Sequence, residues 1–274
     1  MGRRLSGDNG LAMRTLLDRM KIVAAIAVGA ALLASCGGRV EGVLVPVAAT
    51  VPGASIVNLA VATTRSRAED RGVLFTGERS SQPDFANIVV SIPPDSARKI
   101  GDVQWPKKLP GNPATDFVTL KAEDMTLAQA KVWFNDRIKA TPGHKALVFI
   151  HGFNNRFDDA VYRFAQIVHD SRAPVVPVLF TWPSRGSILA YGYDLQSNNY
   201  SRDALEQLLT ALATNPNVSE VDVLAHSMGN VVTLEALRQM AIRNGRVYPK
   251  IRNVMLAAPD VDVDVFRSQM ADIG

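Results

Sequence analysis

The sequence predicts an α/β fold in three layers, with a mostly parallel sheet between two layers of helices. Three observations lead to this prediction. Short apolar stretches alternate with helical patterns of ten or more residues between residues 126 and 257, as in a parallel sheet with crossover helices. A chain of 274 residues, 47% of them hydrophobic, can bury one sizeable core. A serine also lies in a turn of small residues after one apolar stretch, where such sheets place their sites.

The first 35 residues have the layout of a cleaved export signal. Met20 and a lysine precede an apolar run over residues 22–33, which is too short to span a bilayer comfortably. The run leads into Leu-Ala-Ser-Cys36, which resembles the lipobox of bacterial lipoproteins, whose cysteine is acylated. Cys36 is the only cysteine of the chain. We therefore expect a lipoprotein signal peptide over residues 1–35; an ordinary signal peptide with a free cysteine nearby is the alternative.

The same segment predicts how the chain begins and where the protein is located. Residues 1–19 show no apolar periodicity, so we expect translation to start at Met13 or Met20. Residues 36–55 are rich in Gly, Pro, Val and Ala and suit a tether between the lipid and a folded domain over residues 56–274. Glycine follows the cysteine where aspartate would favour the inner membrane. We expect a lipid-anchored protein of the bacterial cell envelope, at the outer membrane and facing the periplasm.

Charge and motifs exclude several function classes. Five of the 30 basic and two of the 26 acidic residues lie in the first 35, which leaves 25 basic against 24 acidic residues. A balance this near to neutral gives no electrostatic case for nucleic acid binding. The sequence has no Walker loop, no paired cysteines and no HExxH motif. We expect no cofactor and no metal.

Two strands and one helix are expected before residue 145. The strands are predicted over residues 56–62 and 88–92, with a polar loop between them and two prolines after the second. Residues 95–116 are interpreted as an irregular surface connection. Thr126 and Gln129 have the form of a capping box, so we expect a helix to start there.

Beyond residue 145 the alternation is regular. The expected strands cover residues 146–150, 175–180, 218–225 and 254–257, and the expected helices cover residues 157–169, 201–212 and 228–243. Parallel strands of this kind bury both faces, and their sites form at the carboxyl ends of the strands.

Ser227 stands at that edge and is interpreted as a nucleophile. It follows the strand 218–225 and precedes the helix 228–243, and Ala225 and Gly229 lie two residues before and after it. This is the G-x-S-x-G pattern with alanine in its first glycine place. A sharp turn of small residues lifts the hydroxyl out of the sheet and aims helix amides at a reacting carbonyl. A plain turn or helix cap is the alternative interpretation.

The strand 146–150 leads into a second loop, which begins with His151 and Gly152. Acyl transfer develops negative charge on a carbonyl oxygen, and two backbone amides are the usual means of stabilising it. We expect these donors to be the amides of Met228 and Phe153. Gly152 would allow the backbone to approach closely, and His151 is interpreted as a structural hydrogen-bond donor. A simple strand-to-helix turn is the alternative.

With these motifs the chain resembles the α/β-hydrolase superfamily, and in particular bacterial lipoproteins with esterase or lipase likeness that are grouped under a domain of unknown function. The stretches that carry the resemblance are Val61–Arg65, Val90–Pro93, His151–Asn154, Thr181–Ser184, Ala225–Asn230 and Ala258–Asp260. In this superfamily the triad follows the order serine, acid, histidine. The resemblance implies that Asp260 is the acid, with Asp262 or Asp264 as alternatives. The acidic cluster also fits a helix N-cap before Val265.

The resemblance further implies a histidine base after the acid, which the printed sequence does not supply. Its histidines are His144, His151, His169 and His226, and all four precede Ser227. A last strand and a histidine loop would also be missing from the fold. Either the sequence is a truncated hydrolase, which we favour, or the protein does not turn over. Loss of the histidine lowers turnover roughly a million-fold, so we expect the 274-residue chain to be almost inactive.

The function expected from these observations is a serine hydrolase of carboxylic esters, acting through an acyl-enzyme on a lipid or other acyl ester of the envelope. Residues 181–200 leave a strand near Ser227 and either line the acyl or alcohol pocket or pack over a helix. Two other functions remain open. One is a lipid-anchored binding or scaffold protein without turnover, and the other is an acyltransferase.

Overall fold

The computed structural model describes residues 40–48 and 50–274. The expected signal peptide over residues 1–35, the start at Met13 or Met20 and the lipidation of Cys36 fall outside the described residues. Among the residues that are described, no helix is both long and apolar enough to cross a membrane.

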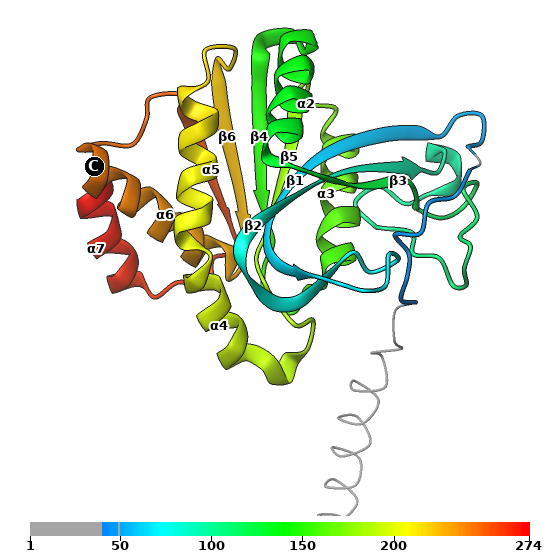
Figure 1. Cartoon of the computed structure of the whole chain (residues 1–274), viewed down its shortest axis with the longest axis horizontal. Coiled ribbons are helices and arrows are strands. Elements are labelled where there is room, and N and C mark those ends of the chain that lie inside the picture. The colour runs from blue at the N-terminus through cyan, green and yellow to red at the C-terminus, as the bar shows by residue number, and fades with distance from the viewer. Residues whose placement is uncertain (1–39, 49) are drawn as a thin grey trace, which may run out of the picture. The chain divides into compact units, whose positions relative to one another are not determined.

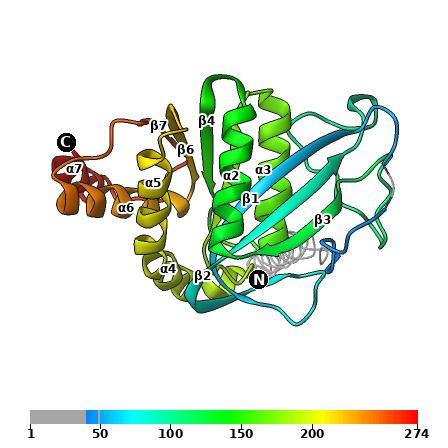
Figure 2. The same ribbon diagram turned by 45° about the horizontal axis from the view of Figure 1, so that its top comes forward.

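A seven-stranded sheet in the order β3-β2-β1-β5-β4-β6-β7 forms the centre of the domain. Its strands are β1 (Ser55–Arg67), β2 (Phe75–Ile92), β3 (Val118–Met125), β4 (Lys145–Ile150), β5 (Val176–Thr181), β6 (Glu220–His226) and β7 (Ile251–Ala257). Five strands that are adjacent in the sheet, β1, β5, β4, β6 and β7, run parallel to one another. Strand β2 is antiparallel to both β1 and β3. Strands β3 and β7 lie at opposite ends of the sheet (Figure 2). The predicted α/β fold with a mostly parallel sheet is confirmed.

Helices cover both faces of the sheet (Figure 1). They are α2 (Leu127–Ala140), α3 (Phe157–Ser171), α4 (Tyr191–Tyr200), α5 (Arg202–Thr214), α6 (Gly229–Asn244) and α7 (Val263–Ile273). Along β4, Ala146, Val148 and Ile150 pack in one apolar cluster with α2, α5 and α6, while Leu147 and Phe149 pack in a second cluster with α3. Alternate residues of one strand thus reach opposite cores, which is why the parallel strands are apolar throughout.

The expected boundaries fail mainly in the first half of the domain. The polar loop expected after residue 62 is mostly strand, because β1 and β2 continue as an antiparallel ribbon whose pairing reaches Arg67 and Phe75. Strand β3 was not predicted at all. The expected tether over residues 36–55 is partly folded, since Val43 and Leu44 are buried with the core and Leu44 N–H donates to Gly72 O.

The segment expected as a loop over residues 181–200 contains the helix α4. Only three of its ten residues are buried, and all three are polar, so no apolar periodicity marks it in the sequence. It runs into α5 at Ser201, whose side chain makes no capping hydrogen bond to that helix. The Ser201 hydroxyl instead donates to Ser197 O at 2.7 Å and contacts the Thr64 hydroxyl at 2.7 Å. Tertiary hydrogen bonds therefore define this helix.

Candidate active site

Ser227 lies in a strained turn between β6 and α6. Its φ is 51°, a left-handed conformation that residues with a side chain adopt rarely and usually at functional sites. The Ser227 N–H donates to Ala257 O of β7 at 2.9 Å. The Ser227 carbonyl accepts from Asn230 Nδ2 at 2.7 Å, from Asn230 N at 3.0 Å and from Asp260 N at 3.3 Å. The turn is therefore fixed by contacts with the neighbouring strand and with its own helix.

Gly229 allows α6 to begin directly against the end of β4. A Cβ at this position would lie 2.5 Å from His151 O and 2.8 Å from Ile150 O. Both oxygens belong to backbone that the sheet holds in place, so a larger residue would push the helix away. The small residue that the sequence places after Ser227 thus brings the turn against the loop after β4.

That loop approaches Ser227 through Gly152. A Cβ on Gly152 would lie 2.9 Å from Ser227 Cβ and 2.9 Å from His226 Nδ1. The Gly152 carbonyl accepts from His151 Nδ1 at 2.8 Å and from Asn155 Nδ2 at 3.3 Å. Because carbonyl and N–H point in opposite directions across a trans peptide, the Phe153 N–H is directed away from these two donors.

The peptide between Ser227 and Met228 follows the same principle. Its carbonyl accepts from Asn230 and Asp260, so the Met228 N–H points to the opposite side. The carbonyl of the next peptide, Met228 O, accepts from Asn198 Nδ2 at 3.2 Å. Both amides expected to stabilise an oxyanion thus belong to peptides whose carbonyls are held by other donors.

His151 is buried, and both of its ring nitrogens are engaged. Its Nε2 accepts from Trp182 N at 3.2 Å, and its ring stacks on the Trp182 ring with centroids 4.8 Å apart. Burial, followed by the charge of Arg65, lowers the pKa of His151 to about 3. The imidazole is therefore neutral at pH 7. Since its partners at Nε2 are donors, we assign the proton to Nδ1, which donates to Gly152 O.

Of the three candidate acids, Asp260 is the one whose backbone N–H donates to the carbonyl of Ser227. Its carboxylate accepts from the Tyr191 hydroxyl at 3.2 Å, and the Tyr191 ring packs edge-on against Phe153. Asp262 caps α7, since its Oδ1 accepts from Asp264 N at 2.9 Å and from Val265 N at 3.1 Å. The alternative interpretation as a helix cap therefore describes Asp262, while Asp260 lies between the nucleophile turn and Tyr191.

The Ser227 hydroxyl has no histidine partner among residues 40–48 and 50–274. His144 contacts Ile138 O and His169 contacts Asp95, both through ring nitrogens. His226 is exposed beside Gly152. In the part of the chain that the structure describes, no three His, Cys, Asp or Glu residues are grouped so that they could hold a metal ion.

A family described as "Alpha/beta hydrolase of unknown function (DUF900)" matches residues 126–274, more than half of the chain. The chain belongs to this family. No curated protein and no solved structure matches it. The expected place in the α/β-hydrolase superfamily is confirmed. The matched range begins at the N-cap of α2 and includes β4, the nucleophile turn and Asp260, so it covers every candidate site residue but Cys36.

Sequence analysis missed the buried polar residues that support the candidate site. Arg65 and Ser184 lie in stretches that carry the family resemblance, but no chemistry was assigned to them. The Ser184 hydroxyl donates to the buried Asp194 of α4 and accepts from Asn155 N at 3.1 Å. These contacts connect α4 to the loop that holds Phe153. In the sequence, the one signal for these residues was a polar side chain close to the end of an apolar stretch. Their burial became visible only in the structure.

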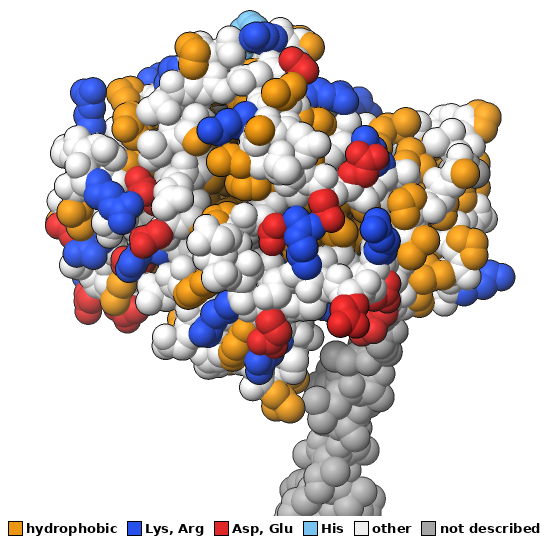
Figure 3. Space-filling model, viewed as in Figure 1, with side chains coloured by type: hydrophobic (Ala, Val, Ile, Leu, Met, Phe, Trp, Pro, Cys, Tyr) orange, Lys and Arg blue, Asp and Glu red, His pale blue; other side chains and the backbone are white. Residues whose placement is uncertain are grey.

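A groove of about 660 Å³ lies between α2 and α5, with Ala62, Phe85 and Phe180 among its lining residues. Hydrophobic side chains gather in a hollow on this face of the molecule (Figure 3). None of the groove's lining residues belongs to the nucleophile turn or to the loop 151–155. The groove is therefore separate from the candidate active site.

Proposed function

We propose that this protein is a serine hydrolase of carboxylic esters and that Ser227 forms the acyl-enzyme. The close approach of Gly152 to Ser227 carries this proposal, because it brings a second backbone segment to the nucleophile. The left-handed conformation of Ser227 and the orientation of the peptides that carry the Met228 and Phe153 amides support it. Two such donors are the usual means of stabilising the oxyanion of acyl transfer.

The reaction follows from these positions. Ser227 Oγ loses its proton to a base and bonds to the acyl carbon, and the ester C–O bond breaks as the alcohol leaves with a proton. Water then attacks the acyl-enzyme, the acid is released and the Ser227 hydroxyl is restored. In the superfamily pattern a histidine after the acid serves as the base, with Asp260 orienting it.

The substrate class follows from the expected location. Acylation of Cys36 would hold the domain at a membrane surface, where acyl esters of lipids are concentrated. We therefore propose a lipid or another envelope acyl ester as the substrate and the periplasmic side of the outer membrane as the place of action. Labelling of Cys36 by a radioactive fatty acid in growing cells would test this location, and a Cys36→Ala variant should lose both the label and the membrane association.

Covalent labelling tests the nucleophile directly. In the protein as expressed from its native gene, a fluorophosphonate probe is expected to label wild type once, and labelling and hydrolysis of p-nitrophenyl butyrate should both be lost in Ser227→Ala. Ser171→Ala is the matched control, because Ser171 ends α3 and its hydroxyl bonds only within its own helix end. Labelling that persists in Ser227→Ala would contradict the assignment.

A second function is favoured by one observation: in the described residues no histidine contacts the Ser227 hydroxyl. A binding or scaffold protein on the same fold would need no base. It predicts that an acyl ester is retained at the site without release of alcohol or acid. Equilibrium binding of a radiolabelled acyl ester, followed by product analysis, separates this function from hydrolysis.

A further inference from the structure

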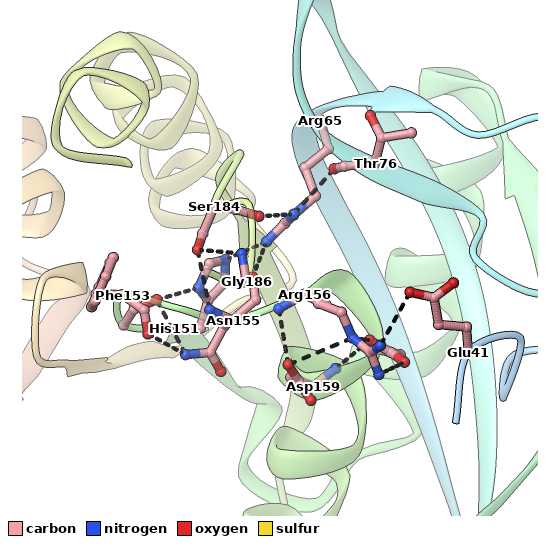
Figure 4. A network of polar contacts seen from close by, with 12 residues as sticks. Glu41, Arg65, Thr76, His151, Phe153, Asn155, Arg156, Asp159, Ser184 and Gly186 are labelled. Carbon is pink, nitrogen blue, oxygen red and sulfur yellow. Dashed lines mark hydrogen bonds and ion pairs between the residues drawn. The ribbon is translucent and has the colours of Figure 1, made fainter. Parts of the chain in front are cut away.

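Two stretches that are far apart in the sequence meet behind the loop 151–155. Thr63 of β1 pairs with Thr181 of β5, and this register places Arg65 beside the chain that follows β5. The Arg65 side chain points toward Ser184, His151 and Asn155 (Figure 4). Arg65 is completely buried. A cation thus lies directly behind the loop 151–155, which carries the expected oxyanion donor Phe153.

All five N–H donors of the Arg65 guanidinium have partners. The acceptors are Thr181 Oγ1 at 2.8 Å from Nε, Thr76 O at 3.1 Å and Ser184 O at 2.8 Å from Nη1, and Asn155 O at 2.9 Å and His151 Nε2 at 3.4 Å from Nη2. Each acceptor is an uncharged group. Burial lowers the pKa of Arg65 to about 10, so the group stays charged at pH 7.

A buried cation whose hydrogen bonds are all with neutral acceptors is costly, because the carboxylates of Asp194, Asp158 and Asp159 offset its desolvation without contacting it. The position of Arg65 between four chain segments therefore needs a reason other than packing. Its two Nη2 contacts indicate that reason.

Both Nη2 partners also hold the Gly152 carbonyl. His151 accepts from Arg65 at Nε2 and donates from Nδ1 to Gly152 O. Asn155 accepts from Arg65 at its backbone carbonyl and donates from Nδ2 to Gly152 O. Because guanidinium can only donate, Arg65 requires an unprotonated Nε2 on His151, as does the Trp182 N–H at 3.2 Å. Together these two donors place the proton of a neutral ring on Nδ1.

We propose that Arg65 is a positioning residue that orients the Phe153 amide through His151 and Asn155. Together with the Trp182 N–H it holds the His151 tautomer that keeps a donor on the Gly152 carbonyl, and the trans peptide then directs the Phe153 N–H away from His151 and toward the nucleophile side. The inference rests on the proposed function, because the Phe153 amide matters only where a carbonyl oxygen becomes negative.

The substitutions His151→Asn and His151→Gln separate the two ring nitrogens. Asparagine places its amide nitrogen near the position of Nδ1 and can still donate to Gly152 O. Glutamine reaches the position of Nε2 and loses that donor. Removing one oxyanion donor costs on the order of 100-fold to 1,000-fold in kcat, so a misdirected donor should cost roughly tenfold to 100-fold.

We would measure kcat and KM for p-nitrophenyl butyrate together with thermal unfolding, on the protein as expressed from its native gene. His151→Asn should keep kcat within about threefold of wild type, while His151→Gln should lose roughly tenfold or more with KM little changed. Arg65→Met should lose kcat in the same way, and Arg65→Lys should recover part of it. Arg98→Met is the matched control, because the Arg98 side chain is also fully buried but pairs with Asp170, whose helix α3 packs in the second apolar cluster.

Arg98→Met is expected to lower the melting temperature without changing kcat. Nitrogen-15 NMR of the imidazole adds a readout that does not need turnover. Wild type should show a single Nδ1–H tautomer, and its Nε2 resonance should shift in Arg65→Met, which removes one of the two donors at that atom. Equal kcat values for His151→Asn and His151→Gln, or an Nε2–H tautomer in wild type, would overturn the inference. If turnover persists in Ser227→Ala, the proposed function fails instead, and the NMR result still decides whether Arg65 donates to His151 Nε2.

Discussion

Replacing Gly229 by alanine tests the contact that brings the nucleophile turn against β4. The new Cβ would lie 2.5 Å from His151 O and 2.8 Å from Ile150 O, where ordinary contacts begin at 3.4 Å. Helix α6 must therefore move by about 0.9 Å along the shorter contact. The obstructing oxygens are backbone atoms at the end of β4, so no side-chain rotation relieves the clash.

The size of the effect follows from that displacement. Overpacking of a tightly packed site costs about 1–3 kcal/mol, and we expect the upper part of this range because backbone must shift. A displacement of about 1 Å at a nucleophile can cost on the order of 100-fold in rate. Gly229→Ala should therefore lower both the free energy of unfolding and the rate of Ser227 labelling by a fluorophosphonate.

The assays are urea unfolding followed by circular dichroism and the second-order rate of labelling. Gly192→Ala is the matched control, because Gly192 lies in α4 and nothing is within 4 Å of the added Cβ. An exposed helical glycine replaced by alanine should stabilise by about 1 kcal/mol at most, without a change in labelling. Wild-type unfolding and labelling in Gly229→Ala would refute the close approach of α6 to β4.

Three further predictions concern stability. His151 should make the protein less stable in acid: its pKa is about 3 in the folded state and 6.5 in the unfolded chain, so unfolding takes up a proton between these values. Stability should fall by up to about 1.4 kcal/mol per pH unit below pH 6.5, and urea unfolding at pH 7 and pH 5 should show a smaller difference in His151→Asn. Asp262→Ala should cost about 1 kcal/mol by removing the N-cap of α7, seen as lower helicity and melting temperature, and an unchanged melting temperature would contradict the cap. Asp170→Asn should lower the free energy of unfolding by roughly 3 kcal/mol, because the buried Arg98 loses its closest carboxylate. Asp102→Asn in an exposed ion pair should cost less than about 1 kcal/mol in the same unfolding assay.

The elements that the sequence predicted well are those with a strong local signal. The capping box of Thr126 and Gln129 forms as expected and begins α2 at Leu127. The apolar runs of β4 and β5 were placed to within one residue at each end. Burial on both faces makes nearly every residue of such a strand apolar, so residue type alone reveals them.

The elements that were missed have weak local signals. Strand β3 buries only Val118 and Thr119, and its polar residues interrupt the apolar pattern. Helix α4 buries polar residues, among them Asp194. The hydrogen-bond partners of the Asp194 carboxylate are the Ser184 hydroxyl and the Arg185 N–H, which lie in the chain after β5. Their hydrogen bonds replace the apolar face that a sequence pattern would need.

The sequence by itself determined the alternation of strands and helices, the turn that carries Ser227 and the small residues on either side of it. These features depend on periodicity and on the steric limits of single residues, which residue types encode directly. The tertiary structure decided the neighbours of Arg65, whose acceptors come from positions 11 to 119 residues away along the chain. Three of these five acceptors are backbone carbonyls, which every residue possesses. Only the fold could therefore show which carbonyls would meet this arginine behind the oxyanion loop.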